Sequence, residues 1–597
     1  MSNQDRPKKL QRISQACDLC HRRSIRCRPS AENPSEKCQN CEDFGVACTF
    51  FRPSRRRRNP SLARRNSPNV LPEAQQNTSP ALDNSRAYDP TTLKHDRLGR
   101  PSGIDRSIDS NGLDLAWRNY ALASKAVIDH YMDFYMNLVY PMLPLFHRPT
   151  LYEDLEKLRY LQDAGLFASI MAACALAAVR GWHGALSDRW RLEDDPERSA
   201  EAFFAAAKDT IPNDLERAAG LGFLRACGLL ALTSLQQGAI TTAQQYLGLY
   251  HTLGRMQKTY DERSWPPSMP IIEQEERRRL FWTVYKLEIN VSIAYDSPLW
   301  VPESECRVRY PSEVEDDAVI GGVPLQTKAS SWLRGWNFVT DLHRILEHAL
   351  TRIRRQDHLP DDRYPVSRVF ASEEVPNSQV MDNALRLYYQ LPAPLRNFSA
   401  PATGELAQDL LGFQAASVQM TLQSLRVTLF SATTSHDLYQ KCYVAEQVLT
   451  ALHSIAPQHL LALGAPLAHH LSAIGRILEA ATQGLLCEQA YQRVRSLLIS
   501  LADLLQALGH GIPLVAGADR ELRARIHMID EYIEAQRQLI SSVDMGVTRL
   551  TSIDAMDGGF GSEGTPVNVG LTAPLEEFQL PDELVGDEAW PWPFAAT

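Results

Sequence analysis

The chain has 597 residues, 44% of them hydrophobic and 22% charged, as in an ordinary protein that buries sizeable cores. Its formal net charge of −9 hides an asymmetry, because residues 1–65 carry 16 Lys and Arg against 6 Asp and Glu, whereas residues 550–597 carry nine acids and no base. The longest uncharged apolar run, residues 164–179, is shorter than the roughly 18 to 20 residues of a membrane span, and residues 1–15 lack an apolar leader. We therefore expect an intracellular chain without a membrane span, whose basic end meets nucleic acid.

Six of the eleven cysteines follow the spacing C-x2-C-x6-C-x10-C-x2-C-x6-C near the N-terminus: Cys17, Cys20, Cys27, Cys38, Cys41 and Cys48. Paired CxxC units in an intracellular chain favour metal ligation over disulfides, and zinc prefers tetrahedral thiolate sites. Six sulfurs complete two tetrahedral sites only if two of them bridge both ions. Three disulfides or an iron-sulfur centre are the alternatives, although the spacing does not match ferredoxin patterns.

The phrase "ACDLCHRRSIRC" followed by "CQNCEDFGVACTF" resembles the fungal zinc binuclear cluster transcription factors, which bind DNA through six cysteines. The resemblance implies two zinc ions, a nuclear location and double-stranded DNA as the partner, with CGG triplets in its sites. It also implies that Cys17 and Cys38 are the bridging sulfurs. One ion would then be held by Cys17, Cys20, Cys27 and Cys38, and the other by Cys17, Cys38, Cys41 and Cys48.

Charge distinguishes the two cysteine-rich halves. The first carries arginines on a predicted short helix after Cys17, whereas the second has Glu42 and Asp43 at the equivalent place. Guanidinium groups are attracted to phosphates and guanine edges, so we expect the first half to enter the major groove. Family members usually have Lys or Arg at the positions of His21 and Ser24. The predicted DNA-binding residues are His21, Arg22, Arg23, Ser24, Arg26 and Arg28, together with the basic arm Arg55, Arg56, Arg57 and Arg58, which also suits a nuclear import signal.

Composition divides the chain into five segments and predicts a mostly α fold. Residues 10–58 form a small zinc cluster domain with its basic arm, and residues 59–112 a disordered linker rich in Pro, Ser and Asn. Helical periodicity then predicts a large all-α regulatory region, 113–330 and its continuation 331–545. Residues 546–597 form a disordered acidic tail with interleaved aromatic residues. Residues 59–112 lack coiled-coil heptads, which favours a monomer, or a homodimer formed through the helical region.

The stretch "EQEERRRLFWTVYKLEIN" begins at Glu273 and predicts an amphipathic core helix. Its expected i,i+4 ion pairs are Glu273–Arg277 and Glu275–Arg279, and its apolar stripe is Leu280, Phe281, Val284 and Leu287. The stretch also resembles the fungal-specific transcription factor domain, or middle homology region, over about 115–330. Glu288 and Ile289 replace the last two residues of that family's signature. The resemblance implies a regulatory module that senses a small-molecule effector or a corepressor.

We find no HExxH, GxSxG, Walker loop or strand-anchored GxGxxG, so we predict no catalytic residue and no enzyme. The tail interleaves acids with Trp590, Trp592 and Phe594, a composition typical of segments that bind coactivators, although a solubilising end is the alternative. The sequence thus predicts a nuclear activator of RNA polymerase II transcription that controls a metabolic or secondary-metabolite pathway. The alternatives are a repressor and, less favoured, a metabolite-binding enzyme in the helical region.

Overall fold

The computed structural model of the chain describes residues 17, 20, 27, 37–43, 48, 113–182, 196–320, 323–324, 331–356, 375–401, 403, 406–432, 437–553, 578–585 and 590. The chain divides into two compact units, Met1–Pro90 and Thr91–Thr597. In the first unit the described helix is α2 (Gln39–Asp43). The predicted linker, 59–112, lies outside the described residues.

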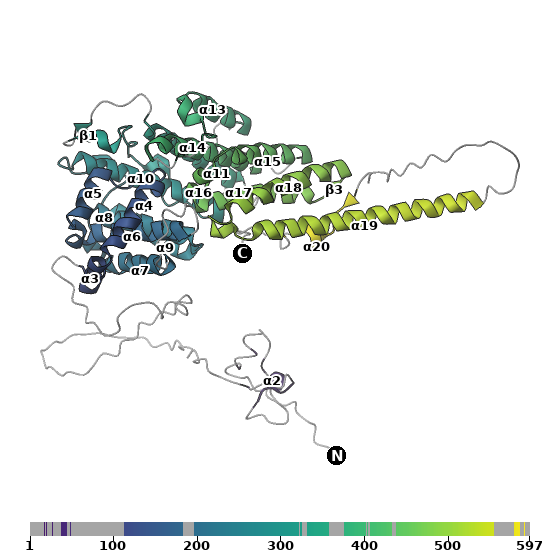
Figure 1. Cartoon of the computed structure of the whole chain (residues 1–597), viewed down its shortest axis with the longest axis horizontal. Helices are drawn as coiled ribbons and strands as arrows, with labels where there is room; N and C mark the ends of the chain where they lie inside the picture. Colours follow the sequence, from purple (N-terminus) through teal and green to yellow (C-terminus); the bar gives the residue numbers. More distant parts are fainter. Residues whose placement is uncertain are drawn as a thin grey trace, which may run out of the picture. The chain divides into compact units, whose positions relative to one another are not determined.

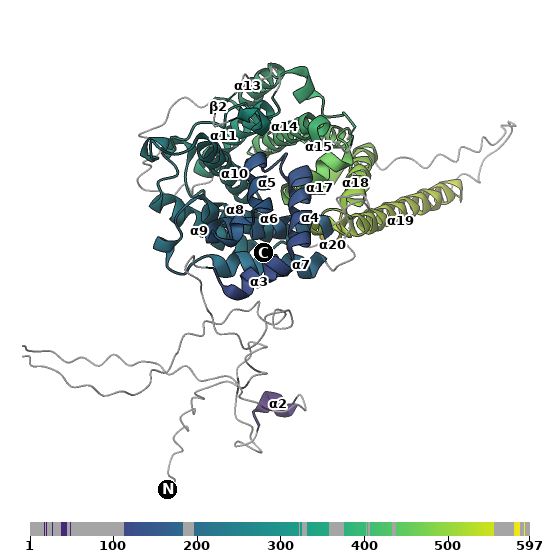
Figure 2. The same cartoon turned by 60° about the vertical axis from the view of Figure 1, so that its left-hand side comes forward.

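The second unit is built of helices, as the mostly α prediction required, and Figures 1 and 2 show them in chain order from blue to yellow. Its α-helices are α3 (Leu115–Ala123), α4 (Lys125–Phe134), α5 (Arg148–Glu156), α6 (Ala164–Trp182), α7 (Pro196–Thr210), α8 (Leu221–Gln236), α9 (Ile240–Met256), α10 (Ile271–Tyr295), α11 (Leu333–Gln356), α13 (Asn377–Tyr389), α14 (Leu406–Ser431), α15 (Leu438–His453), α16 (Pro457–Leu463), α17 (Ala465–Thr482), α18 (Glu488–Leu508), α19 (Ala518–Ile553) and α20 (Asp582–Val585).

Short elements connect the long helices. They are a π-helical turn, η2 (Tyr135–Val139), and the 3-10 turns η3 (Arg159–Leu161), η5 (Leu215–Arg217), η6 (Glu262–Ser264), η7 (Glu303–Glu305), η8 (Asp316–Ala318), η9 (Ala393–Arg396) and η10 (Pro513–Val515). The described strands are two antiparallel pairs, β1 (Val319–Ile320) with β2 (Val323–Pro324), and β3 (Leu485–Leu486) with β4 (Phe578–Gln579).

Helix α6 lies at the centre of the first hydrophobic core, packed against α4, α7 and α8. Its alanine-rich sequence favours a helix and lets neighbouring helices approach closely. A window of 18 residues, Ala164–Gly181, is long and apolar enough to cross a membrane, yet 83% of it is buried inside the protein. The burial supports the predicted role of this segment as a core helix.

Helix α14 belongs to both hydrophobic cores of the second unit. Val418 and Leu422 on one face pack into the first core, which runs from Leu113 to Ala465. Ala416 and Met420 on the other face pack into the second, which is built from α15 to α19. In Figures 1 and 2, α3 to α10 accordingly gather on one side of α14 and α15 to α19 on the other. The first core also includes residues of α11 and α13, so it continues past residue 330.

Helix α10 is buried around its whole circumference in its middle section, with every residue from Arg278 to Ile289 inside the protein. The predicted amphipathic pattern is therefore wrong for this section, because neighbouring helices cover the helix on all sides. The Glu273–Arg277 ion pair is confirmed at 2.8 Å. The expected Glu275–Arg279 ion pair does not form. Arg279 pairs with Asp316 at 2.7 Å, and Glu275 pairs with Arg278 at 2.6 Å.

Asp316 connects three segments that are far apart in the sequence. Its carboxylate accepts from the Tyr140 hydroxyl at 2.6 Å and from the Arg148 backbone N–H at 2.9 Å, and it pairs with the Arg279 guanidinium. Both charged side chains are almost fully buried, with 2% of Asp316 and 3% of Arg279 exposed. Burial raises the pKa of Asp316, but Arg279 and the hydrogen bonds outweigh it, so this pKa lies below its usual value.

The C-terminal segment contacts the second core at its described residues. Strand β4 pairs with β3, so that Leu486 lies opposite Phe578. Leu580, Val585 and Trp590 are buried in the second core, and Arg525 of α19 donates to the Glu583 carbonyl at 3.1 Å. The composition did not predict this attachment, nor that α19 continues past residue 545 to Ile553.

We expect Asp316→Asn to lower the free energy of unfolding by about 3 to 5 kcal/mol, because it leaves the buried Arg279 guanidinium without its counter-charge. Urea denaturation of the full chain measures the change. The difference from the parent should shrink as the pH falls through the pKa of Asp316 in the folded protein, because a lowered pKa stabilises the fold only while the carboxylate is ionised.

Glu153→Gln is the matched control, because Glu153 of α5 forms exposed ion pairs with Lys157 and Arg159. Equal effects of the two substitutions would show that burial of the Asp316 pair contributes nothing.

Candidate metal centre

The structure brings all six N-terminal cysteines together in two groups of four. One group is Cys17, Cys20, Cys27 and Cys38, and the other is Cys17, Cys38, Cys41 and Cys48. Within each group the sulfur atoms lie within 4.8 Å of one another, and none of the six cysteines forms a disulfide. Cys17 and Cys38 belong to both groups, so the arrangement has the two shared sulfurs that six ligands around two tetrahedral ions require.

The sulfur-to-sulfur distances suit zinc. A tetrahedral thiolate site with Zn–S of about 2.3 Å has sulfurs about 3.8 Å apart. Cys17 Sγ lies 3.6 Å from Cys38 Sγ and 3.7 Å from Cys41 Sγ, and Cys20 Sγ lies 3.6 Å from Cys38 Sγ. Disulfide sulfurs would lie about 2.05 Å apart. The geometry of these described pairs therefore fits a metal cluster and excludes disulfides between them.

Backbone turns hold the first sulfur of each CxxC unit. The Cys20 N–H points to Cys17 Sγ at 3.5 Å, and the Cys41 N–H points to Cys38 Sγ at 3.4 Å. The side-chain amide of Asn40, on α2, donates to Cys20 Sγ at 3.3 Å and so connects the second half to the first. Sequence reasoning missed Asn40, because a single Asn between two cysteines belongs to no recognised spacing. Hydrogen bonds of this kind orient ligands and tune their charge.

The two shared thiols are the more acidic ones. Burial raises the pKa of Cys17, but hydrogen bonds from the Cys20 N–H and from neighbouring thiols outweigh it and lower this pKa to about 6. The pKa of Cys38 is also lowered, because bonds from Cys41 and Cys20 exceed the effect of burial. At Cys27 burial dominates and raises the pKa to about 12. The protein environment therefore favours the thiolate form at the two sulfurs that belong to both groups.

The predicted DNA-binding residues lie outside the described residues. They are His21, Arg22, Arg23, Ser24, Arg26, Arg28, Arg55, Arg56, Arg57 and Arg58. Glu42 and Asp43, the two acids of the second cysteine-rich half, are residues of helix α2.

Comparison with protein families agrees with this geometry. Residues 15–58 match the fungal Zn(2)-Cys(6) binuclear cluster domain, and residues 130–390 match the fungal specific transcription factor domain. Comparison with curated proteins and with solved structures gave no match. The chain thus carries both domains of a fungal Zn(2)-Cys(6) transcription factor, as the sequence predicted. Its cluster domain binds two zinc ions, and these domains imply DNA binding and a nuclear location. Neither domain family is a family of enzymes.

We expect two zinc ions per chain in native mass spectrometry of the full-length protein. Cys17→Ala or Cys38→Ala should remove both ions, because each substitution takes a ligand from both four-sulfur groups. Cys27→Ala should weaken one site only, and Cys48→Ala the other.

The control is Cys487→Ala, since Cys487 is an exposed free cysteine in the second unit. Loss of a single ion from the Cys17→Ala protein would contradict shared ligation by that sulfur.

Proposed function

We propose that this protein is a zinc-dependent, sequence-specific DNA-binding regulator of RNA polymerase II transcription. The observation that carries the proposal is the sharing of Cys17 and Cys38 by two four-sulfur groups. In this proposal the six cysteines hold two zinc ions, each closed by four thiolates. Closed coordination leaves no open position for a substrate, so the zinc is structural and orders the segment that meets DNA.

The first cysteine-rich half is proposed to contact DNA. Arg22, Arg23 and Arg26 supply positive charge between Cys20 and Cys27, and the basic arm at residues 55–58 suits the phosphate backbone. Arg23 is the proposed base-reading residue, because a guanidinium can bond both acceptors of a guanine in the major groove. Since Ser24 is uncharged, Arg23 then carries most of the sequence preference for CGG triplets.

The helical unit and the tail are proposed to regulate and to recruit. The buried Arg278 and Arg279 of α10 are held in structural ion pairs with Glu262 and Asp316, which supports regulation by binding and not catalysis by these groups. A small-molecule effector and a second copy of the chain are the proposed partners of this unit. Residues 546–597 combine nine acids with aromatic side chains and are proposed to bind coactivators, which makes the protein an activator; a repressor is the alternative.

Arg23→Ala should weaken binding of the full-length protein to a duplex with CGG triplets by about 10- to 100-fold, because it removes a bidentate base contact. Binding to a scrambled duplex should fall much less. Fluorescence anisotropy at a fixed salt concentration measures both affinities.

Lys37→Ala is the control, since it removes one positive charge in the segment between the two cysteine-rich halves. Equal losses on both duplexes from Arg23→Ala would mean that Arg23 contacts only phosphates.

Residues 546–597 fused to a heterologous DNA-binding domain should activate a reporter gene in fungal cells. Replacing Trp592 and Phe594 with Ala should abolish the signal at equal protein level, because coactivator grooves bind aromatic anchors. A fusion that stays silent, or that lowers transcription, would favour the repressor alternative.

A further inference from the structure

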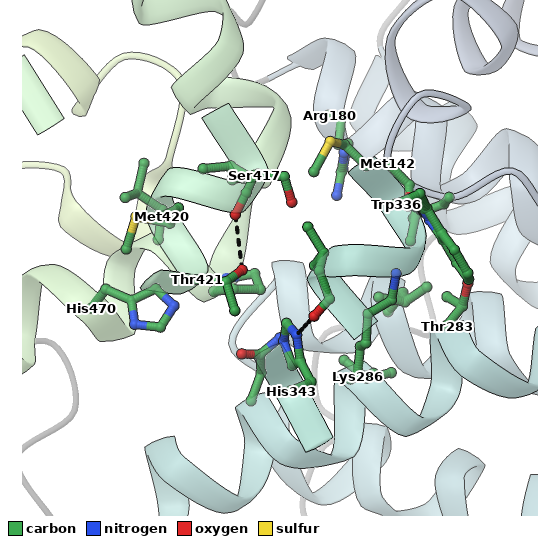
Figure 3. Close-up of a pocket in the computed structure, with 18 residues that line it drawn as sticks. Met142, Arg180, Thr283, Lys286, Trp336, His343, Ser417, Met420, Thr421 and His470 are labelled. Atoms are coloured by element: carbon green, nitrogen blue, oxygen red, sulfur yellow. Dashed lines mark hydrogen bonds between the residues drawn. The ribbon is translucent and has the colours of Figure 1, made fainter. Parts of the chain in front are cut away.

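A pocket lies at the junction of the two hydrophobic cores of the second unit. Its walls come from α10 and α11 of the first core, from the shared helix α14, and from α16 and α17 of the second (Figure 3). The cavity has a volume of about 110 Å³. An apolar cavity of about 150 Å³ takes one benzene molecule, so this smaller cavity suits an organic molecule no larger than benzene.

The charged groups of the pocket are all basic. None of its 18 lining residues is Asp or Glu, whereas Arg180, Lys286, His343 and His470 are among them. Burial lowers the pKa of His343 to about 3 and that of His470 to about 4, so both imidazoles are neutral near pH 7. The positive charge of the pocket can therefore come only from Lys286 and Arg180.

Lys286 differs from the other buried cations of its own helix. Arg278 and Arg279, which lie two turns earlier on α10, are each paired with carboxylates. Lys286 is only 9% exposed, yet the ion pairs of the described residues do not include it. Its Nζ lies 3.3 Å from the centroid of the Trp336 ring, a cation–π contact, and Figure 3 shows the two side chains side by side. Burial lowers the pKa of Lys286 well below its usual value.

Arg180 enters the pocket from the C-terminal end of α6, on another side in Figure 3. Its Nη1 donates to the Ala462 carbonyl at 3.0 Å, whereas its buried Nε has no hydrogen-bond partner. The hydroxyl of Thr283, one turn before Lys286, is also buried without a partner. Buried polar atoms are nearly always satisfied, so unsatisfied donors around one cavity point to a polar group that occupies it.

We propose that this pocket binds a small organic carboxylate, with the carboxylate between Lys286 and Arg180 and its apolar part against the surrounding leucine and methionine side chains. Thr283 donates a further hydrogen bond to the ligand. A carboxylate supplies the counter-charge that Lys286 lacks in the protein, and the two cations are then each partly neutralised. The inference rests on the proposed regulatory role of the helical unit and names the chemical class of its effector.

The position of the pocket gives such a ligand a way to act on the whole helical unit. The residues that it touches belong to both cores, so binding stabilises one arrangement of the two cores relative to others. Ligand binding in the helical unit can be measured without DNA, and so its failure is distinguishable from a failure of the DNA-binding proposal.

The test uses acetate, propionate and butanoate as probes, with acetamide, propanamide and butanamide as uncharged counterparts. Isothermal titration calorimetry of the full-length protein measures each affinity. We expect at least one acid to bind with a Kd below about 1 mM and at least about tenfold more tightly than its amide. Lys286→Met should weaken acid binding by at least about tenfold, because only Arg180 then remains to meet the carboxylate, while the control Lys441→Met, in α15, should leave it unchanged.

A second variant keeps the cations and fills the cavity. Leu232→Phe adds bulk at the wall contributed by α8, so it should abolish binding of acids and amides alike. In the absence of ligand, Lys286→Met should be at least as resistant to heat as the parent, because it removes a buried amine without a counter-charge. Failure of all three acids to bind the parent at 10 mM, or equal acid binding by the parent and Lys286→Met, would overturn the proposal. A lower melting temperature of Lys286→Met with no acid binding would make Lys286 a structural contact of Trp336.

Discussion

The ion pair between Arg279 and Asp316 is the interaction on which the first core of the helical unit depends. It lies in a medium where an isolated charge is costly, so each partner is tolerable only in the presence of the other. Asp316 also bonds the Tyr140 hydroxyl and the Arg148 backbone, so the same carboxylate fixes the segment between α4 and α5. Neighbouring acids of α10 extend the network: Glu276 pairs with Arg225 of α8 at 2.8 Å and accepts from the His147 N–H. The acid-arginine cluster thus connects separate segments of the chain across the core.

The zinc cluster likewise depends on the attraction between opposite charges, here between thiolates and zinc ions. Thiolates gathered within 4.8 Å would repel one another, and divalent cations turn that repulsion into attraction. A short segment with few apolar residues gains its order in this way, because its described core consists of the cysteines themselves. In the helical unit, by contrast, order comes from two hydrophobic cores that share α14. The buried ion pairs there determine which segments contact one another.

Sequence reasoning succeeded where counting or composition was sufficient. Six cysteines at a duplicated spacing predicted two four-sulfur groups, and the helical period predicted the all-α class, because both signals are local. It failed where side chains meet partners distant in the chain. Arg279 was assigned to Glu275 from i,i+4 spacing, but its partner Asp316 comes from a turn beyond the helix. Glu288, a departure from the family signature, contacts His251 of α9, which no local pattern indicates.

The sequence by itself was sufficient to identify the six cysteines of the metal cluster. It also determined the order of the helical segments and the opposite charges of the two ends. Only the tertiary structure decided which charges are buried and paired. The sequence pattern does not indicate that Lys286 is buried, because α10 has the pattern of an amphipathic helix with a solvent-exposed face. Helices α11, α14 and α17 enclose this part of α10, so Lys286 points into a cavity instead of solvent. The reason is physical: the cost of burying a charge depends on every segment packed around it, and no local pattern records those neighbours.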